Sequence, residues 1–245
     1  MKLIGHRASC GYFTENSMEA IEYSNKIDID GIEIDIQFTS DNYPIISHDR
    51  TLERLFNKEI FIHDILKEDV QNFTGIVFLE EVLEKINPKL QLFLEIKGEF
   101  NLKGCKKILD ILEKFSFEKY KNKNERCEWL KKVSICSYNQ DICKYFNDMK
   151  IYLNAEQVLF HDRIINYNVF FITSNTFNIN ILNQIFQYCD GYVIHHENVN
   201  KEVVDYCNKY NKSIYVYTIN SRILFNYINK FNINGVISDV PLELK

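Results

Sequence analysis

The chain has 245 residues, of which 46% are hydrophobic and 26% are charged, a balance typical of a globular protein. Only 8 glycines and 3 prolines occur, which excludes collagen-like and proline-rich classes, and neither a dinucleotide fingerprint nor a Walker-type phosphate loop is present. The 29 basic and 34 acidic residues give a net charge of −5, which argues against a nucleic-acid partner and leaves room only for a local basic pocket.

Short apolar runs alternate with segments of helical periodicity along the whole chain. Apolar residues recur at helical spacing in four segments, 79–86, 105–112, 182–189 and 224–231. Asn16, with Glu19 three positions on, is predicted to cap the first helix. Strands are predicted at 2–5, 32–38, 44–47, 90–96, 133–137, 151–153, 192–194, 214–218 and 236–238, with a weaker one at 170–173. This alternation, without a linker, predicts one domain over residues 1–245, folded as an α/β (β/α)8 TIM barrel.

Polar side chains end the first strand and follow one face of the second. His6 and Arg7 close the first strand, where barrel enzymes gather their catalytic groups. Glu33 and Asp35 share one face of the second strand, because side chains alternate along a strand. Two carboxylates inside a barrel need a positive partner, and a hard divalent cation is a common one. The alternative is a solvated strand face or a salt bridge.

The segment 32–48 is predicted to form a β-hairpin extension at the C-terminal mouth of the barrel. Only residues 39–43 separate its two apolar runs, which is too short for a parallel crossover. With the turn centred near Asp41 and Asn42, residue i faces residue 83 − i, so His48 is expected opposite Asp35. That position would bring His48 over the barrel mouth, beside the carboxylates.

The run 90–97 repeats the polar pattern at its carboxyl end. Glu95 and Lys97 lie on one face of it, so Glu95 is a candidate third metal ligand and Lys97 a candidate cation for an anionic group. The alternative is a surface ion pair. Two histidines for proton transfer, two cations for a phosphate and three carboxylates for a metal suit phosphodiester cleavage without an organic cofactor.

These residues resemble the motifs of the glycerophosphodiester phosphodiesterase family, in family order over nearly the whole chain. The matching segments are 5–7, 15–17, 31–35, 48–52, 95–97, 137–139, 217–220 and 235–239. The resemblance implies metal-dependent hydrolysis of a small-molecule glycerophosphodiester to glycerol 3-phosphate and an alcohol, with the glycerol hydroxyl attacking phosphorus.

The resemblance also implies a role for each site residue, and these roles are expectations. His6 and His48 would be the general acid and base, without an assignment of which is which. Arg7, Lys97 and Tyr217 would bind the substrate. The three carboxylates, Glu33, Asp35 and Glu95, would hold Mg²⁺ or Ca²⁺.

Some positions depart from the family pattern. Ala8 stands where glycine is usual, Tyr217 replaces a tryptophan, and Tyr138 with Asn139 replaces a Phe-Asp pair. The connection between residues 153 and 192 aligns least, and the tripeptide 161–163, which repeats the His-Asp-Arg of 48–50, follows no clear strand and is taken as a chance match. The departures bear on the choice of head group more than on the reaction.

Two other functions stay open at this point. One is a lysophospholipase D-like or sphingomyelinase D-like phosphodiesterase that acts on lipids, and the other is a non-catalytic phosphodiester-binding protein. No run of apolar residues is long enough to span a membrane, and no apolar leader follows Met1, so we expect no stable membrane insertion. Seven cysteines without a C-x-x-C pair favour reduced thiols and a cytoplasmic location. We also expect a monomer or a weak homo-oligomer.

Overall fold

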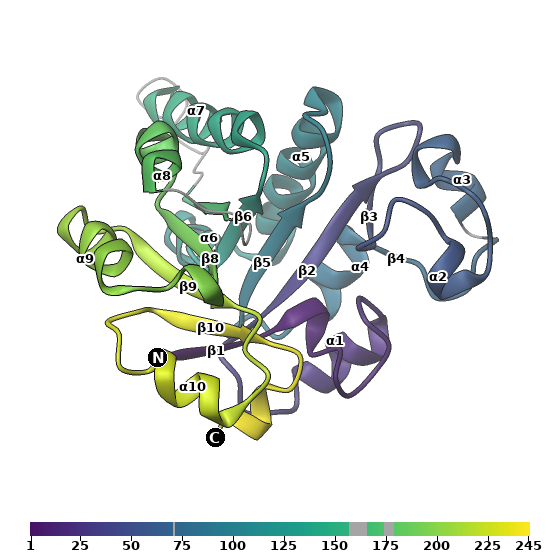
Figure 1. Cartoon of the computed structure of the whole chain (residues 1–245). Coiled ribbons are helices and arrows are strands. Elements are labelled where there is room, and N and C mark those ends of the chain that lie inside the picture. Colours follow the sequence, from purple (N-terminus) through teal and green to yellow (C-terminus); the bar gives the residue numbers. More distant parts are fainter. Residues whose placement is uncertain (71, 157–165, 174–178) are drawn as a thin grey trace.

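The predicted TIM barrel is confirmed in a computed structural model that describes residues 1–70, 72–156, 166–173 and 179–245. Eight parallel strands of these residues follow one another in the order β1, β10, β9, β8, β7, β6, β5 and β2, and β2 pairs with β1 to close the ring (Figure 1). The barrel strands are β1 (Lys2–Gly5), β2 (Gly31–Phe38), β5 (Gln91–Ile96), β6 (Val133–Ser137), β7 (Asn168–Ile172), β8 (Gly191–His195), β9 (Ser213–Tyr217) and β10 (Gly235–Ser238).

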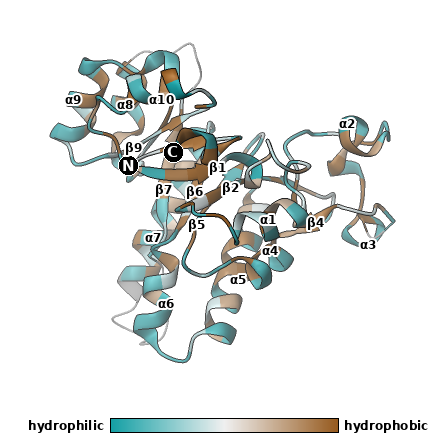
Figure 2. Ribbon diagram, turned by 90° about the horizontal axis from the view of Figure 1, so that it is seen from below, coloured by the Kyte–Doolittle hydropathy of each residue, from teal (hydrophilic) through white to brown (hydrophobic). Residues whose placement is uncertain are grey.

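Helices surround the barrel, with apolar residues concentrated on the strands and polar residues on the outward helix faces (Figure 2). The α-helices outside the hairpin extension are α1 (Met18–Ser24), α4 (Leu79–Lys85), α5 (Leu102–Lys119), α6 (Lys123–Leu130), α7 (Gln140–Glu156), α8 (Ile179–Ile185), α9 (Lys201–Lys209) and α10 (Arg222–Ile228). Short 3-10 helices are η1 (His6–Ala8), η2 (Ile62–Asp64), η3 (Phe186–Tyr188), η4 (His196–Asn198) and η5 (Pro241–Leu244). Each of the four segments of predicted helical periodicity overlaps one of these α-helices: α4, α5, α8 and α10. Within the described residues, no helix combines the length and apolar character needed to cross a lipid bilayer.

The two faces of β2 have different surroundings, as the alternation of its side chains predicts. Ile32, Ile34 and Ile36 are fully buried in the main core, between the barrel and its helices. Glu33 and Asp35 face the inside of the barrel instead. The interior below them is filled by a separate apolar cluster, Ile4, Phe93, Cys136, Phe170, Ile172, Val193, Tyr215 and Ile237. Because this apolar cluster fills the rest of the interior, the polar groups lie together at the end of the barrel where the strands have their carboxyl ends.

The hairpin extension is confirmed, but its register differs by one residue from the prediction. The chain of the hairpin continues from β3 (Pro44–Ile46) into α2 (Glu53–Phe56), η2, α3 (Lys67–Val70) and β4 (Val77–Phe78), which were not predicted. From here on, the hairpin extension means all these elements, which stand beside the barrel in Figure 1. Gln37 faces Ile45 in the antiparallel pair, and the amide of Ser47 donates to the carbonyl of Asp35 at 3.0 Å. His48 therefore lies one position beyond the partner of Asp35. The turn causes this shift. The amide of Thr39 donates to the carbonyl of Tyr43, so the turn is centred on Asp41 and not between Asp41 and Asn42.

One predicted strand is wrong, and the weaker strand candidate is confirmed. The run 151–153 is the last part of α7, where Leu153 is buried while Ile151 and Tyr152 are more than half exposed, as on an amphipathic helix. The weaker candidate at 170–173 supplies the barrel strand instead, as β7. The tripeptide 161–163 lies outside the described residues.

Candidate active site

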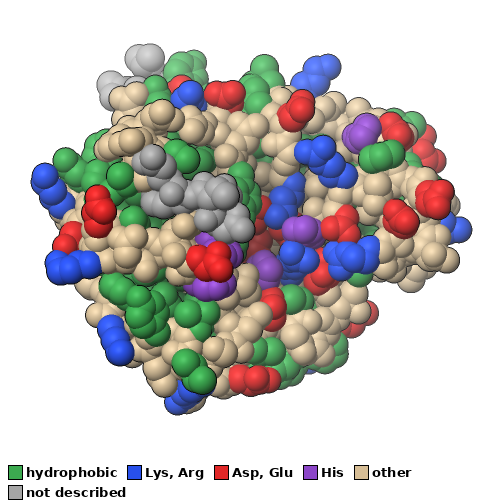
Figure 3. Space-filling view, in the orientation of Figure 1, with side chains coloured by type: hydrophobic (Ala, Val, Ile, Leu, Met, Phe, Trp, Pro, Cys, Tyr) green, Lys and Arg blue, Asp and Glu red, His purple; other side chains and the backbone are tan. Residues whose placement is uncertain are grey.

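A pocket of about 140 Å³ opens at the carboxyl ends of the barrel strands, between the barrel and the hairpin extension. Figure 3 shows basic, acidic and histidine side chains meeting in this hollow. Seven of the eight predicted site residues line it, and the eighth, Asp35, is fully buried beneath. The lining consists of His6, Arg7, Glu33, His48, Phe93, Glu95, Lys97, Cys136, Tyr138, Ile172, Val193, Tyr217, Thr218 and Ile237.

The three carboxylates form one compact group of oxygen donors. Glu33 and Asp35 come from β2 and Glu95 from the neighbouring β5, where parallel pairing sets Asp35 beside Glu95. One oxygen of each lies within 4.8 Å of the others, and all three residues are buried. The Oε1 atom of Glu33 is buried and has no hydrogen-bond partner. A buried carboxylate oxygen without a partner is costly, and a cation would relieve this cost.

The electrostatics of this group also suit a hard cation. Burial and the charge of Asp35 raise the pKa of Glu33 to about 8. Burial and the charge of Asp35 likewise raise the pKa of Glu95, against the opposing effect of Lys97. Burial alone would raise the pKa of Asp35 too, but the Lys97 ammonium group holds it below its usual value. Carboxylate oxygens at this spacing fit Mg²⁺ or Ca²⁺, both of which prefer oxygen ligands.

Two basic side chains adjoin the carboxylates. The Nζ atom of Lys97 lies 2.9 Å from Oδ1 of Asp35 and also pairs with Glu95. The Nε atom of Arg7 lies 3.6 Å from Oδ2 of Asp35, and its Nη1 lies 3.1 Å from Glu15. Burial by itself would lower the pKa of Lys97, but the surrounding carboxylates raise it. Both basic groups are therefore charged and line the same pocket as the carboxylates.

The turn after β1 aims the Arg7 backbone at the carboxylates. The amide of Arg7 donates to Oε2 of Glu33 at 2.9 Å. Arg7, Ala8 and Ser9 all have positive φ angles, between 45° and 66°. Ala8 thus occupies a backbone conformation that glycine adopts at lower cost.

His6 has a carboxylate partner that the sequence analysis did not assign to the site. Its Nδ1 atom lies 2.6 Å from Oδ1 of Asp239, and its Nε2 atom lies 3.9 Å from Oε2 of Glu33. Burial would lower the pKa of His6, but the hydrogen bond to Asp239 and the nearby negative charges raise it to about 10. The position of Asp239 directly after the last barrel strand is the sequence feature that could have identified it as a site residue.

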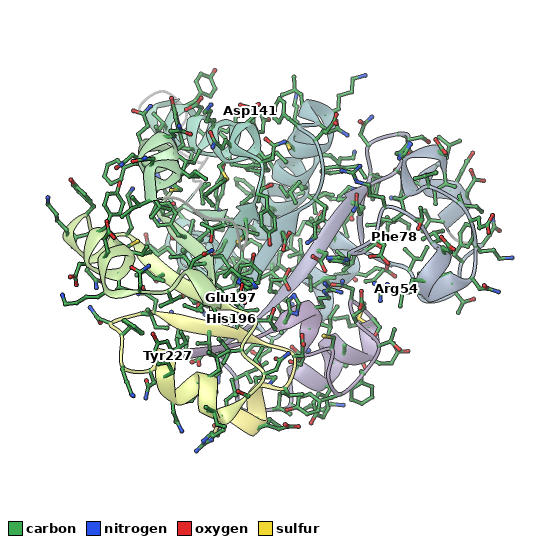
Figure 4. All side chains as sticks on the ribbon, in the orientation of Figure 1. Arg54, Phe78, Asp141, His196, Glu197 and Tyr227 are labelled. Carbon is green, nitrogen blue, oxygen red and sulfur yellow. The ribbon has the colours of Figure 1, made fainter. Side chains whose placement is uncertain are left out.

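His48 is held in the same way by the hairpin extension. Its Nδ1 atom lies 2.8 Å from Oδ1 of Asp49, whose Oδ2 accepts a hydrogen bond from Nε of Arg54 at 2.6 Å. Arg54 also binds Glu15 through both terminal nitrogens. Figure 4 shows Arg54 on the extension side of the opening, across from His196 on the barrel side. Both pocket histidines thus have Nδ1 paired with a carboxylate, which leaves Nε2 for a substrate.

Asn16 supports the carboxylate group and does not cap the first helix, so its predicted role as N-cap is wrong. Its side-chain nitrogen donates to Oδ2 of Asp35 at 2.8 Å, and its side-chain oxygen accepts from the amide of Asp35 at 3.2 Å. Ser17 caps α1 instead, accepting from the amide of Ala20 at 3.2 Å. The cap lies one residue later, which frees Asn16 to orient Asp35.

Two tyrosines form part of the pocket wall. Tyr217 donates its hydroxyl to the carbonyl of Thr173 at 2.6 Å, and the hydroxyl of Tyr138 lies 2.5 Å from that of Tyr217. Tyr138 was noted in the sequence only as a departure from the family pattern, yet it lines the pocket. His195 and His196 stack on one another next to Tyr217, outside the pocket lining.

Comparisons with known proteins agree with the geometry. The model of the glycerophosphoryl diester phosphodiesterase family matches residues 6–243. YhdW of Bacillus subtilis is 26% identical over 98% of this chain and 95% of its own length. The mouse protein named lysophospholipase D GDPD3 is 29% identical over 47% of this chain and 40% of its own length. A phosphodiesterase from Oleispira antarctica, solved with the product sn-glycerol-3-phosphate, has the same fold, with a TM-score of 0.74 at 20% identity, covering 100% of this chain and 95% of that one.

Proposed function

Because the chain belongs to the glycerophosphoryl diester phosphodiesterase family and is therefore a phosphodiesterase, we propose that it hydrolyses glycerophosphodiesters to glycerol 3-phosphate and an alcohol with a divalent cation. The observation that carries this proposal is the buried carboxylate group, with its unpartnered Glu33 oxygen, in one pocket with two carboxylate-paired histidines. If the carboxylates only formed structural salt bridges with Arg7 and Lys97, two carboxylate-paired histidines would not be needed in the same pocket.

Glu33, Asp35 and Glu95 would hold the cation, which is Mg²⁺ or Ca²⁺. Both ions take at least six oxygen ligands, so three carboxylates leave positions for substrate oxygens and water. When bound, the cation polarises a phosphoryl or hydroxyl oxygen and neutralises developing charge. Asn16 fixes the orientation of Asp35 through two hydrogen bonds, which supports a preorganised set of ligands.

The two histidines divide the proton transfers. One imidazole accepts the proton of the attacking glycerol hydroxyl as its oxygen bonds to phosphorus, and the other donates a proton to the alcohol oxygen as the bond from phosphorus to that oxygen breaks. This leaves a cyclic glycerol phosphate. In a second step water loses a proton to one ring as it bonds to phosphorus, and the other ring protonates the glycerol oxygen as its bond to phosphorus breaks, which gives glycerol 3-phosphate. Asp239 and Asp49 each pair with Nδ1 of their histidine and so keep the ring in one orientation.

Arg7 and Lys97 supply the positive charge for the phosphate, and Tyr217 supplies part of the wall around the glycerol unit. Arg7 adds a planar guanidinium with several donors and Lys97 a compact ammonium. Arg7 lies beside Asp35, and Lys97 pairs with both Asp35 and Glu95, so the two basic groups partly offset the negative charge of the carboxylates.

A second cavity, of about 450 Å³, adjoins the first and shares Lys97 with it, and we assign it to the leaving alcohol. Its lining combines polar groups such as Arg50, Glu99 and Asn101 with the edge of the extension. These polar groups support a small polar alcohol, whereas the apolar side chains of the same lining, Phe38, Phe61 and Ile62, and the likeness to the mouse protein named a lysophospholipase D keep a lipid substrate as the second candidate.

A substrate panel tests the proposal. The purified protein is incubated with glycerophosphocholine, glycerophosphoethanolamine, glycerophosphoinositol and a lysophosphatidylcholine, each with Mg²⁺ or Ca²⁺, and glycerol 3-phosphate is measured. We expect release from at least one soluble diester, and loss of turnover in His48→Ala and Glu33→Ala. Release of lysophosphatidic acid from the lysolipid alone would favour the second candidate. Binding without turnover of any substrate, with both metals, would contradict both enzymatic proposals.

We further propose one catalytic domain over residues 1–245 that acts in the cytoplasm as a monomer or weak homo-oligomer. All seven cysteines are free thiols, which supports a reducing compartment. Light scattering at several protein concentrations measures the oligomeric state.

A further inference from the structure

A thiol lies beside one of the two pocket histidines, on the side away from the carboxylate group. Cys10 follows η1, and its Sγ atom lies 3.0 Å from Oδ1 of Asp239, the same oxygen that pairs with Nδ1 of His6. Donor atoms of these three residues lie within 4.8 Å of one another. Cys10 belongs to none of the motifs described above, and it does not line the pocket.

The backbone fixes these three side chains together. The amide of Cys10 donates to the carbonyl of His6 at 3.0 Å, and the amide of Gly11 donates to the carbonyl of Asp239 at 2.9 Å. The β1–β10 pairing holds the same two segments from below. The cluster is therefore preorganised, and each of its residues is partly exposed, so an ion and a water molecule can reach it.

The donor set differs in kind from the carboxylate group. A thiolate, an imidazole nitrogen and a carboxylate oxygen are the ligands of zinc-class ions, whereas Mg²⁺ and Ca²⁺ prefer oxygen alone. Three protein ligands with one water complete a tetrahedral zinc coordination. We propose that His6, Cys10 and Asp239 form a second metal site, which takes Zn²⁺ or a similar soft divalent ion and inhibits the enzyme.

The inhibition follows from the chemistry of the imidazole ring. An ion on Nδ1 of His6 displaces the proton shared with Asp239, and the neutral ring then carries its proton on Nε2. Such a ring cannot accept a further proton, so His6 no longer passes between its neutral and cationic forms. The inhibitory effect rests on the proposed function, whereas binding of the ion does not.

Cobalt binding tests the site without any catalytic assay. Co²⁺ is added to the metal-saturated protein in excess Mg²⁺, and the near-ultraviolet absorption of a thiolate–cobalt bond is recorded. We expect this band in the wild type and in Cys127→Ser, where another partly exposed cysteine, on α6, is removed. We expect no band in Cys10→Ser. Zn²⁺ should also protect Cys10, identified by peptide mass spectrometry, from alkylation at least tenfold.

Zinc titration of turnover tests the consequence. With Mg²⁺ in excess, Zn²⁺ should inhibit the wild type and Cys127→Ser alike, and at least tenfold more Zn²⁺ should be needed for Cys10→Ser. An unchanged cobalt band in Cys10→Ser would assign the thiolate ligand to another cysteine, and equal zinc inhibition of all three proteins would place the inhibitory ion at the carboxylate group. Either result would overturn the proposal. If the protein turns over no diester at all, the cobalt band and the alkylation pattern still decide whether the site exists.

Discussion

The Nδ1 atom of His6 lies 2.6 Å from Oδ1 of Asp239, although 233 positions separate the two residues in the chain. Closure of the barrel creates this pair. β1 and β10 run parallel, with Gly5 beside Ser238, so the residue that follows each strand emerges at the same edge. The first histidine of the pocket thus depends on the last strand of the fold for its partner.

Replacement of this partner should slow the reaction at every pH. In Asp239→Asn, His6 loses the charge that raises its pKa to about 10, so its pKa should fall and kcat should drop by about 100-fold or more. Profiles of kcat against pH measure both effects. The control is Asp205→Asn, on the exposed face of α9. A full kcat with an unshifted profile would show that Asp239 has only a structural role.

The barrel and most of its site could be predicted from the sequence because their signals are local. The E-x-D and E-x-K patterns sit on buried strands, and period-two alternation alone places Glu33, Asp35 and Glu95 in the interior. The partners of the histidines could not be predicted in this way. Asp239 reaches His6 only through closure of the ring, and Asp49 is oriented by Arg54 from the hairpin extension.

Errors arose where two local patterns look alike. The run 151–153 is β-branched and aromatic, yet Leu153 alone is buried there, because the α7 helix turns its neighbours to solvent. Asn16 and Ser17 are both good capping residues, and tertiary contact with Asp35 decides between them. Which of two similar local patterns is adopted therefore depends on contacts with residues distant in the chain, which a short stretch of sequence does not contain.

Loss of Arg54 should impair catalysis more than stability. This side chain joins Asp49 to Glu15, and so fixes the hairpin extension against the turn after β1. It is 47% exposed, so its ion pairs should contribute about 1 kcal/mol or less to folding. In Arg54→Ala we expect a small change in unfolding free energy and a kcat about tenfold lower, because Asp49 no longer holds His48 firmly.

Chemical denaturation and steady-state kinetics measure the two effects of Arg54→Ala. Arg50→Ala is a suitable control, since Arg50 lines the second cavity and is expected to change KM for the diester more than kcat. Equal kcat values for wild type and Arg54→Ala would show that His48 does not need this support.

Stability without metal should fall as pH rises. The pKa of Glu33 is raised from 4.5 to about 8, so between these values the folded protein holds a proton that the unfolded chain has lost. Stability is then lost progressively across this interval. His6, with its pKa raised from 6.5 to about 10, adds a loss of the same sign at higher pH. Thermal unfolding in EDTA from pH 5 to pH 9 should show this fall.

Metal binding should have the opposite dependence on pH. A cation needs ionised Glu33, so its affinity should rise with pH up to about 8, by about tenfold per unit where one proton is displaced. Calorimetry with Mg²⁺ at several pH values, in two buffers of different ionisation enthalpy, counts the protons released. Glu33→Gln removes the titrating group, and a pH slope that persists in this variant would assign the proton to another residue.

Lys97 should compete with the cation for the same carboxylates. Its Nζ atom lies 2.9 Å from Asp35 and pairs with Glu95, so Lys97→Met leaves these buried charges uncompensated. Without metal, the variant should lose about 3–5 kcal/mol of unfolding free energy, the usual result of breaking a buried pair. With Mg²⁺, part of this loss should be recovered, and affinity for the ion should exceed that of the wild type by at least tenfold, because a positive charge beside the site is gone.

Turnover of Lys97→Met should nevertheless fall, since the phosphate loses one of its two basic partners. The matched control is Lys97→Arg, which keeps the charge and should keep both wild-type Mg²⁺ affinity within about threefold and measurable turnover. Calorimetry gives the affinities and release of glycerol 3-phosphate gives kcat. If Lys97→Met bound Mg²⁺ no more tightly than the wild type, then Lys97 would not be competing with the ion, and the carboxylates that it contacts would not be the metal ligands.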